Sequence, residues 1–391
     1  MGRASVLQEI RTMRFEEVYD RWTEARLTQR EAADVLGVCE RQFRRQCRRY
    51  ESDGIDGLID LRVGQVSTRR APVDEVLRLV TQYRDRYVGW TVQHFYSKYR
   101  EQKGARSYNF VRLTLQREGL VTKAKRRGAH RRKRERKPLI GMMLHQDGSR
   151  HEWLPGQQHD LIVTLDDATG AIYSAFLVSE EDTMSSFAGV AEVIARHGLF
   201  NSLYTDRGSH YWHTAHAGGK VDRVELTQFG RAMTQLGIEM IPAYSPEARG
   251  RSERAFGTLQ DRLPKELADA AITDLAAANR FLKRRFIPAY NREFAVPAAE
   301  TGSAFVPWVG GNLNDILCVQ EERVVRPDNC VAYQNKLLQI PADRHRCHYV
   351  KAKVRVHEYS DGNLAVFHGP RCLAHYAANG KELKIKMKAA A

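Results

Sequence analysis

A run of basic residues divides the chain into parts that must fold separately. Ten of the fifteen residues from Lys123 to Lys137, KAKRRGAHRRKRERK, are Lys or Arg, and one, Glu135, is acidic. Because the run has no large apolar side chain, it cannot bury a core of its own. We expect residues 123–137 to form a basic linker between two folded parts; a solvated segment without a partner is the alternative.

The charge of the whole chain indicates a polyanionic partner. The 391 residues contain 62 Lys and Arg against 47 Asp and Glu, a formal charge of +15. Such a balance favours nucleic acid over a membrane as the partner. No apolar run approaches the roughly 20 residues that span a bilayer, and the N-terminus lacks the apolar core of a secretory signal. The six cysteines show no C-x-x-C pair, so we expect reduced thiols and a cytoplasmic protein.

Residues 1–62 contain the pattern of a helix-turn-helix DNA-binding domain. Thr28 is placed to cap a helix over residues 29–36, Gly37 to end it, and a second helix is expected from about Cys39 to Tyr50. A small helical bundle with a solvated basic face is the alternative. If the second helix enters a major groove, its arginines contact phosphates and base edges; these are Arg41, Arg44, Arg45 and Arg48.

Residues 70–122 predict a second helical DNA-binding domain. Apolar residues keep helical spacing, and Ser107 is placed to cap a last helix that carries Arg112 as a DNA contact. Two linked domains can grip a longer site than one, although a plain helical spacer is the alternative. The linker after them would follow the phosphate backbone with Lys125, Arg126, Arg127, Arg131, Arg132 and Lys133.

After Pro138 the pattern changes to short apolar runs that predict a mixed sheet covered by helices. The segment LIVTLDDATGAIYSAFLV is typical of two strands joined by a turn at DDATG, and TMSSFAGVAEVIARHG of a helix capped by Thr183. These elements predict an α/β domain over residues 138–300. From residue 315 to 376 the pattern is β, with a hairpin turn at Asp361-Gly362, and predicts a small β-barrel.

Three acidic residues fall where a sheet of this kind can bring them together. We expect Asp147 at the end of the first strand, Asp206 at the end of the fourth, and Glu253 one or two turns into a helix. Three carboxylates in one crevice repel each other unless cations are bound, and oxygen ligands favour Mg²⁺ or Mn²⁺. Two such ions per site suit phosphodiester chemistry.

Other roles remain open for these acids and their neighbours. Asp206 could be an ordinary turn residue in YTDRGSHY. Asp166, Asp167 and Glu247 are weaker candidates for the acidic site. Three arginines of the same helix could hold phosphates beside the cations or could form a solvated face; they are Arg249, Arg251 and Arg254.

The segments HQDGS, YTDRGSHY and AYSPEARGRSERAFGTLQDRL together resemble the integrase-core DDE transposases of bacterial insertion sequences, closest to the ISNCY type, and more distantly retroviral integrases. The resemblance covers most of the chain. It implies a ribonuclease H-like catalytic core over residues 138–300, with Asp147, Asp206 and Glu253 as the catalytic, metal-binding triad. It also implies cleavage and transfer of DNA strands, on transposon ends and target, by a homodimer or higher oligomer at the bacterial nucleoid.

The interval between Asp206 and Glu253 is longer than in the better known members of that family. The surplus falls in YWHTAHAGGKVDRVE, which we expect to be a surface insertion. The main alternative function is a sequence-specific DNA-binding regulator whose ribonuclease H-like core is inactive. A nuclease that does not join strands is a further alternative.

Overall fold

The computed structural model describes residues 3–59, 70–123, 135–214, 216, 219–244, 246–342 and 346–383, without the side chains of 3–6 and 246–249. The chain forms two compact units: Met1–Val88 with Arg106–Thr122, and Gly89–Ala105 with Lys123–Ala391. Within the described ranges no helix is both long and apolar enough to cross a membrane. The predicted linker contacts Lys125, Arg126, Arg127, Arg131, Arg132 and Lys133 lie outside the described residues.

The first unit begins with three helices, α1 (Arg3–Thr23), α2 (Gln29–Leu36) and α3 (Glu40–Asp53), and the 3₁₀ helix η1 (Gly54–Leu58). Thr28 caps α2 as predicted: its Oγ1 accepts from the Glu31 amide at 3.3 Å, and the Glu31 carboxylate accepts from the Thr28 amide at 2.8 Å. Gly37 ends the helix with a φ of 66°. The short turn between α2 and α3 therefore follows from local sequence.

The same unit contains α4 (Val73–Arg86) and α6 (Tyr108–Arg117). Ser107 caps α6 as predicted, since its Oγ accepts from the Phe110 amide at 3.4 Å. Arg106, the residue before this cap, donates to the Glu75 carboxylate of α4 at 2.7 Å. The helix between them in sequence, α5 (Val92–Glu101), belongs to the second unit.

The second unit contains the predicted mixed sheet. Its strands are β1 (Leu144–Leu154), β2 (Gln157–Asp166), β3 (Ile172–Val178), β4 (Ser202–Thr205) and β5 (Glu239–Pro242), in the order β3-β2-β1-β4-β5. The first three strands are antiparallel to one another, whereas β4 runs parallel to β1 and to β5. The turn at DDATG is closed by the Gly170 amide, which donates to the Asp166 carbonyl at 2.8 Å. The α/β prediction is confirmed.

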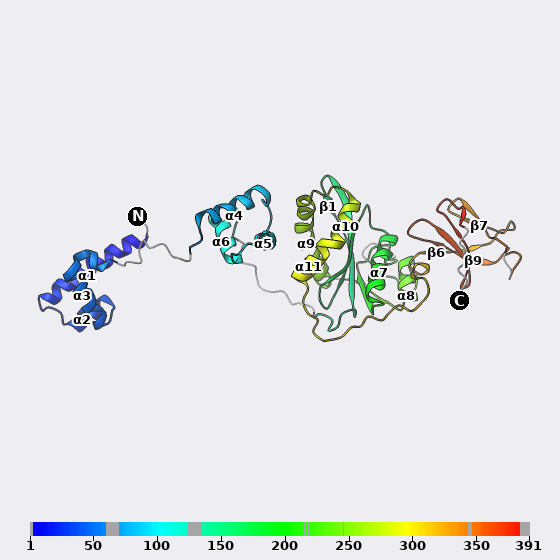
Figure 1. Ribbon diagram of the computed structural model, residues 1–391. Coiled ribbons are helices and arrows are strands. Elements are labelled where there is room, and N and C mark those ends of the chain that lie inside the picture. The colour runs from blue at the N-terminus through cyan, green and yellow to red at the C-terminus, as the bar shows by residue number, and fades with distance from the viewer. Residues whose placement is uncertain are drawn as a thin grey trace. The chain divides into compact units, whose positions relative to one another are not determined.

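Helices cover both faces of this sheet (Figure 1). One face packs on α7 (Thr183–His197) and α8 (Gln228–Gln235). The other packs on α9 (Pro246–Asp269), α10 (Leu275–Phe281), the π-helix η2 (Leu282–Phe286) and α11 (Ile287–Phe294). The predicted cap of α7 is wrong by one residue, because the carboxylate of Asp182, a stronger acceptor than the Thr183 hydroxyl, takes the Ser185 amide at 2.6 Å.

The C-terminal region is rich in β-structure, after the 3₁₀ helix η3 (Leu313–Asp315). A five-stranded sheet has the order β12-β11-β10-β9-β6, and β7 and β8 form a separate pair. In the described residues the edge strands β6 and β12 do not pair with each other, so the predicted closed barrel is not confirmed. Asp361-Gly362 forms the predicted turn between β9 and β10, with Gly362 at a φ of 79°. The strands are β6 (Val319–Val324), β7 (Cys330–Tyr333), β8 (Lys336–Gln339), β9 (Lys353–Glu358), β10 (Leu364–His368), β11 (Arg371–Tyr376) and β12 (Glu382–Leu383).

Candidate active site

Asp147 is the fourth residue of β1 and not its last, so the predicted strand end is wrong. Gly148 and Ser149 continue to pair with Ile162 and Leu161 of β2, which supplies backbone partners even where the side chains of β1 are polar. What ends before Asp147 is the pairing with the parallel strand β4, which joins Leu144 to Leu203 and His145 to Tyr204. Asp147 therefore lies at the point where β1 and β4 diverge.

The register of β1 and β4 brings two of the predicted acids to adjacent positions. Two residues beyond the His145–Tyr204 pair, the same register sets Asp147 beside Asp206, the residue that follows β4. The rings of His145 and Tyr204 lie 5.0 Å apart on one face of the sheet. Since side chains alternate along a strand, Asp147 and Asp206 project from that same face.

Asp206 forms the turn that was considered for it. Its Oδ1 accepts from the Gly208 amide at 2.9 Å, the geometry of an Asx turn. Arg207 is held away from this turn: its guanidinium donates to the Gly219 carbonyl at 2.9 Å and lies over the Tyr244 ring at 5.4 Å. The turn thus ends the strand while it keeps the Asp206 carboxylate beside β1.

The predicted surface insertion after Asp206 is partly buried. Tyr211 and Trp212 have exposed fractions of 1% and 6% and pack among residues of α7 and α8. The Trp212 indole N–H donates to the Thr205 hydroxyl at 2.9 Å, at the end of β4. These two aromatic residues attach the segment to the sheet. Its otherwise polar composition led to the prediction of a surface insertion.

Glu253 is the eighth residue of α9 and is exposed. Helix α9 packs along β1 and has two contacts that fix its direction. Arg251 reaches Asp167, which also binds His145 at 2.7 Å, and the Gln260 amide donates to the Ser149 hydroxyl at 2.9 Å.

The helix and the strand cover equal lengths between these two contacts. Nine residues of helix rise about 13 Å and four residues of strand also span about 13 Å. Residues 252–259 of α9 therefore run beside the part of β1 that contains Asp147, with Glu253 about 4 Å short of the level of Asp147 along the helix axis. The described residues hold no set of three Asp, Glu, His or Cys side chains arranged to bind a metal ion.

A fourth carboxylate, absent from the predicted site, lies against β1 at the residue after Asp147. Glu181 follows β3, and a Cβ on Gly148 would collide with its carboxylate. His210 Nε2 lies 3.3 Å from Glu181 Oε1, and the Tyr211 hydroxyl donates to it at 3.5 Å. Its position three residues after a strand is similar to that of Asp206 and could have drawn attention to it.

Tyr211 is a buried phenol whose pKa responds to the charges of these acids. Burial raises the pKa of Tyr211 well above its usual value, and the negative charge of Glu181 and then those of Asp206 and Asp147 raise it further. The phenol therefore remains protonated at neutral pH and can donate to Glu181.

The arginines predicted to bind DNA occupy different environments. Those of α3 (Arg41, Arg44, Arg45 and Arg48) are exposed, and Arg112 of α6 is half-buried. In α9 the exposed Arg254 donates to the Gly250 carbonyl at 2.6 Å, whereas Arg251 pairs with the buried Asp167. The side chain of Arg249 lies outside the part of the chain that the structure describes.

Sequence comparison identifies the family. Residues 22–72 match the winged helix-turn helix family, which confirms the predicted helix-turn-helix. The chain is 30% identical over 250 residues to the transposase for insertion sequence IS1202 of Streptococcus pneumoniae, over 62% of this chain and 53% of that protein. It is 31% identical over 358 residues to "Putative transposase y4bF" of Sinorhizobium fredii, over 90% of this chain and 77% of the relative. The chain belongs to the transposases of bacterial insertion sequences.

Two solved structures to which this transposase is similar are viral. One is the catalytic core domain of the HTLV-2 integrase in complex with magnesium, at 19% identity and a TM-score of 0.29, over 38% of this chain and 88% of that one. Another is the simian T-cell lymphotropic virus intasome in complex with PP2A regulatory subunit B56 gamma, at 15% identity and a TM-score of 0.34, over 68% and 86%. Scores this low carry no argument about the transposase, whose family rests on the two sequence relatives.

Proposed function

We propose that this transposase cleaves DNA at transposon ends and joins the resulting 3′ hydroxyl to target DNA, with Asp147, Asp206 and Glu253 as its catalytic carboxylates. The observation that carries the proposal is the register of β1 and β4, which places Asp147 beside Asp206 on the face that α9 covers. In this proposal the ribonuclease H-like core cuts and joins, and the N-terminal helices with the basic linker bind the ends.

The donor chemistry of the site fits Mg²⁺ or Mn²⁺. Asp147 and Asp206 offer carboxylate oxygens from neighbouring strands, the ligand type that hard divalent cations prefer. Glu253 is exposed on a helix beside β1, where its long side chain can change rotamer when cations neutralise the acids. Two bound ions would supply the Lewis-acid chemistry that activates the attacking oxygen and stabilises the leaving oxygen of a phosphodiester.

The surrounding residues have supporting roles in this proposal. Asp206 keeps one oxygen on the Gly208 amide, so its carboxylate is oriented before substrate arrives. The exposed arginines of α3 contact the end DNA, and Arg254 lies one residue after Glu253, where a phosphate can reach it. Acting on two ends at once requires at least two copies of the chain, and we propose a homodimer or larger oligomer in the bacterial cytoplasm.

The test is strand cleavage and joining by the full-length protein, with duplex DNA from the transposon end and Mg²⁺. We expect Asp206→Asn to lower both reactions by about 100-fold or more while end binding is retained. Asp222→Asn is the matched control, because Asp222 is an exposed loop carboxylate that accepts the Val224 and Glu225 amides. Equal cleavage by Asp206→Asn and the wild type would refute the assignment. Specific binding by a wild type that never cleaves would instead support the inactive regulator.

A further inference from the structure

Asp167 is a buried carboxylate that no step of the proposed chemistry uses. It lies in the turn between β2 and β3, and its exposed fraction is 0%. A turn explains an Asp at this position, but Asn or Gly would serve a turn equally well. A fully buried carboxylate costs several kcal/mol unless cations and hydrogen bonds compensate it, so its partners need an explanation.

The partners of Asp167 come from three separate segments. His145 of β1 lies 2.7 Å from Oδ1, and Arg251 of α9 forms an ion pair with the same oxygen. The backbone amide of Lys137, at the described end of the basic linker, donates to Oδ2 at 2.8 Å. One carboxylate therefore joins the linker, the central strand and the long helix.

Two of these attachments, His145 and Arg251, lie close in sequence to a proposed catalytic residue. His145 precedes Asp147 by two residues of strand, and Arg251 precedes Glu253 by two residues of helix. Two residues of either element span only about 3 to 7 Å. A shift of β1 against α9 at Asp167 is therefore passed on almost undiminished to the distance between the two carboxylates.

From this geometry we infer that Asp167 is a positioning residue, which sets the placement of Asp147 relative to Glu253 and fastens the basic linker to the site. The inference rests on the proposed function. A misplacement of about 1 Å at a reacting centre can cost about 100-fold in rate, and supporting residues around metal ligands typically contribute 10- to 100-fold in metal affinity or activity.

The substitution Asp167→Asn isolates the charge, because Asn keeps both the size and the turn preference of Asp. The neighbouring Asp166→Asn is a matched control. Asp166 is also fully buried, but its carboxylate accepts from Gly141 and Thr169, and among the described residues it bonds to no side chain of β1 or α9. Arg251→Gln removes the other charge of the pair, and Arg251→Lys restores a cation. The Arg251 variants keep the inference testable if Asp167→Asn does not fold.

The measurements are Mn²⁺ binding by calorimetry and strand cleavage as a function of Mg²⁺ concentration, both on the full-length protein. We expect Asp167→Asn and Arg251→Gln to weaken metal binding by 10- to 100-fold, with cleavage partly recovered at high Mg²⁺. Arg251→Lys should recover most of the loss. Asp166→Asn should lower the melting temperature and leave metal binding within about threefold of wild type.

Two failures can be told apart. If the wild type cleaves but Asp167→Asn behaves as Asp166→Asn does, the positioning role is refuted and the proposed function stands. If the wild type does not cleave, and Asp147→Asn leaves Mn²⁺ binding unchanged, the proposed function itself fails.

Discussion

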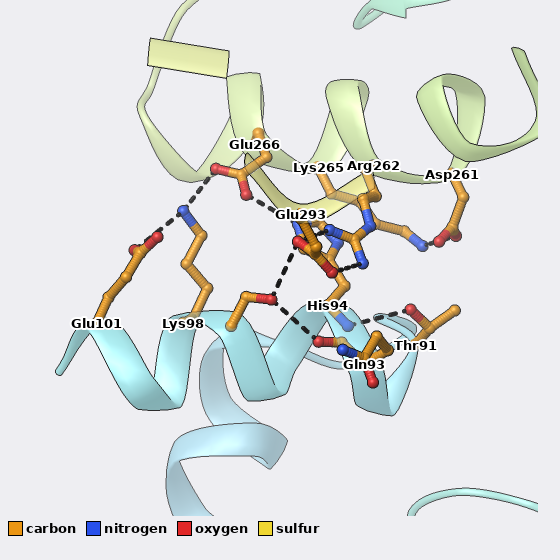
Figure 2. Close-up of polar contacts among 11 residues, drawn as sticks. Thr91, Gln93, His94, Lys98, Glu101, Asp261, Arg262, Lys265, Glu266 and Glu293 are labelled. Atoms are coloured by element: carbon orange, nitrogen blue, oxygen red, sulfur yellow. Dashed lines mark hydrogen bonds and ion pairs between the residues drawn. The ribbon is translucent and has the colours of Figure 1, made fainter. Parts of the chain in front are cut away.

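Helix α5 is held on α9 by a cluster of charged side chains, which makes a strong prediction for Glu266→Gln. In Figure 2 the Glu266 carboxylate faces two side chains of α5. His94 Nε2 lies 2.8 Å from it and Lys98 Nζ 2.6 Å, and the exposed fractions of the side chains of His94, Lys98 and Glu266 are 1%, 17% and 15%. A second contact, from the Ser97 hydroxyl to Glu293 at 3.4 Å, is longer. Glu266 is therefore the main polar attachment of α5.

The expected magnitude follows from this burial. Removing one partner of a fully buried ion pair costs about 3–5 kcal/mol, and a surface pair contributes about 0–1 kcal/mol. Glu266 lies between these limits, and Gln can still accept one hydrogen bond, so we expect a loss of about 2 kcal/mol. That corresponds to a fall of roughly 30-fold in the protection of the α5 amides, measured by hydrogen exchange.

Asp261→Asn is the control, because Asp261 pairs with Lys265 on the same helix, where both side chains are about one-third exposed. We expect that variant to change the protection of α5 by less than about threefold. Unchanged protection in Glu266→Gln, or an equal fall in both variants, would refute the argument that this cluster holds α5.

The effect of pH provides a second check on the same cluster. Burial alone would raise the pKa of Glu266, but hydrogen bonds from His94 and Lys98 outweigh it and leave the pKa below its usual 4.5. Burial lowers the pKa of His94 below 6.5 despite Glu266. Both groups bind protons less readily in the folded chain than in the unfolded chain. Each therefore stabilises the fold above its ordinary pKa, 4.5 for Glu266 and 6.5 for His94, and that stabilisation is lost as pH falls. The difference in α5 protection between wild type and Glu266→Gln should therefore shrink below pH 4.5.

Two further predictions concern other parts of the second unit. Burial, and then the charges of Arg355 and Arg231, lower the pKa of His357 in β9 to about 4. The wild-type C-terminal sheet should therefore lose about 2–3 kcal/mol of stability between pH 6.5 and 4.5, and His357→Phe should abolish that loss. Urea unfolding at the two pH values measures it, and an unchanged pH dependence in the variant would contradict the prediction. Gly198 ends α7 at a φ of 98°, and an added Cβ would collide with the Val306 carbonyl, so Gly198→Ala should cost about 2–4 kcal/mol in thermal unfolding. Gly237→Ala, at a φ of 70° with open space around it, should cost only about 1–2 kcal/mol.

Features that depend on neighbouring residues could be predicted from the sequence. The cap at Thr28 and the stop at Gly37 need partners no more than four residues away. The turn at DDATG and the apolar strands around it also depend on local preferences, and these led to the correct α/β architecture. The prediction of a closed barrel is not confirmed, because closure depends on pairing between strands as distant as β6 and β12, which local patterns do not reveal.

The site was predictable only in part, for the same physical reason. Its position after a strand made Asp206 a candidate, and the resemblance to transposases implied all three residues. The length of β1 beyond Asp147 depends on its pairing with β2, and the HQDGSRHE stretch looks too polar for a strand. The partner of Arg251 is Asp167, 84 residues away, so no local pattern could separate a buried ion pair from a phosphate contact.

Strand β1, which carries Asp147, and strand β4, which precedes Asp206, differ in how strongly they are paired. Asp147 lies within an 11-residue strand with antiparallel pairing along its length, whereas Asp206 follows a four-residue strand between two parallel neighbours. Short parallel ladders open at lower free energy than long antiparallel ones. Asp147 thus stands on the more rigid strand and Asp206 follows the less rigid one. If a bound DNA strand requires the backbone of the site to move, we expect the residues around Asp206 to move more.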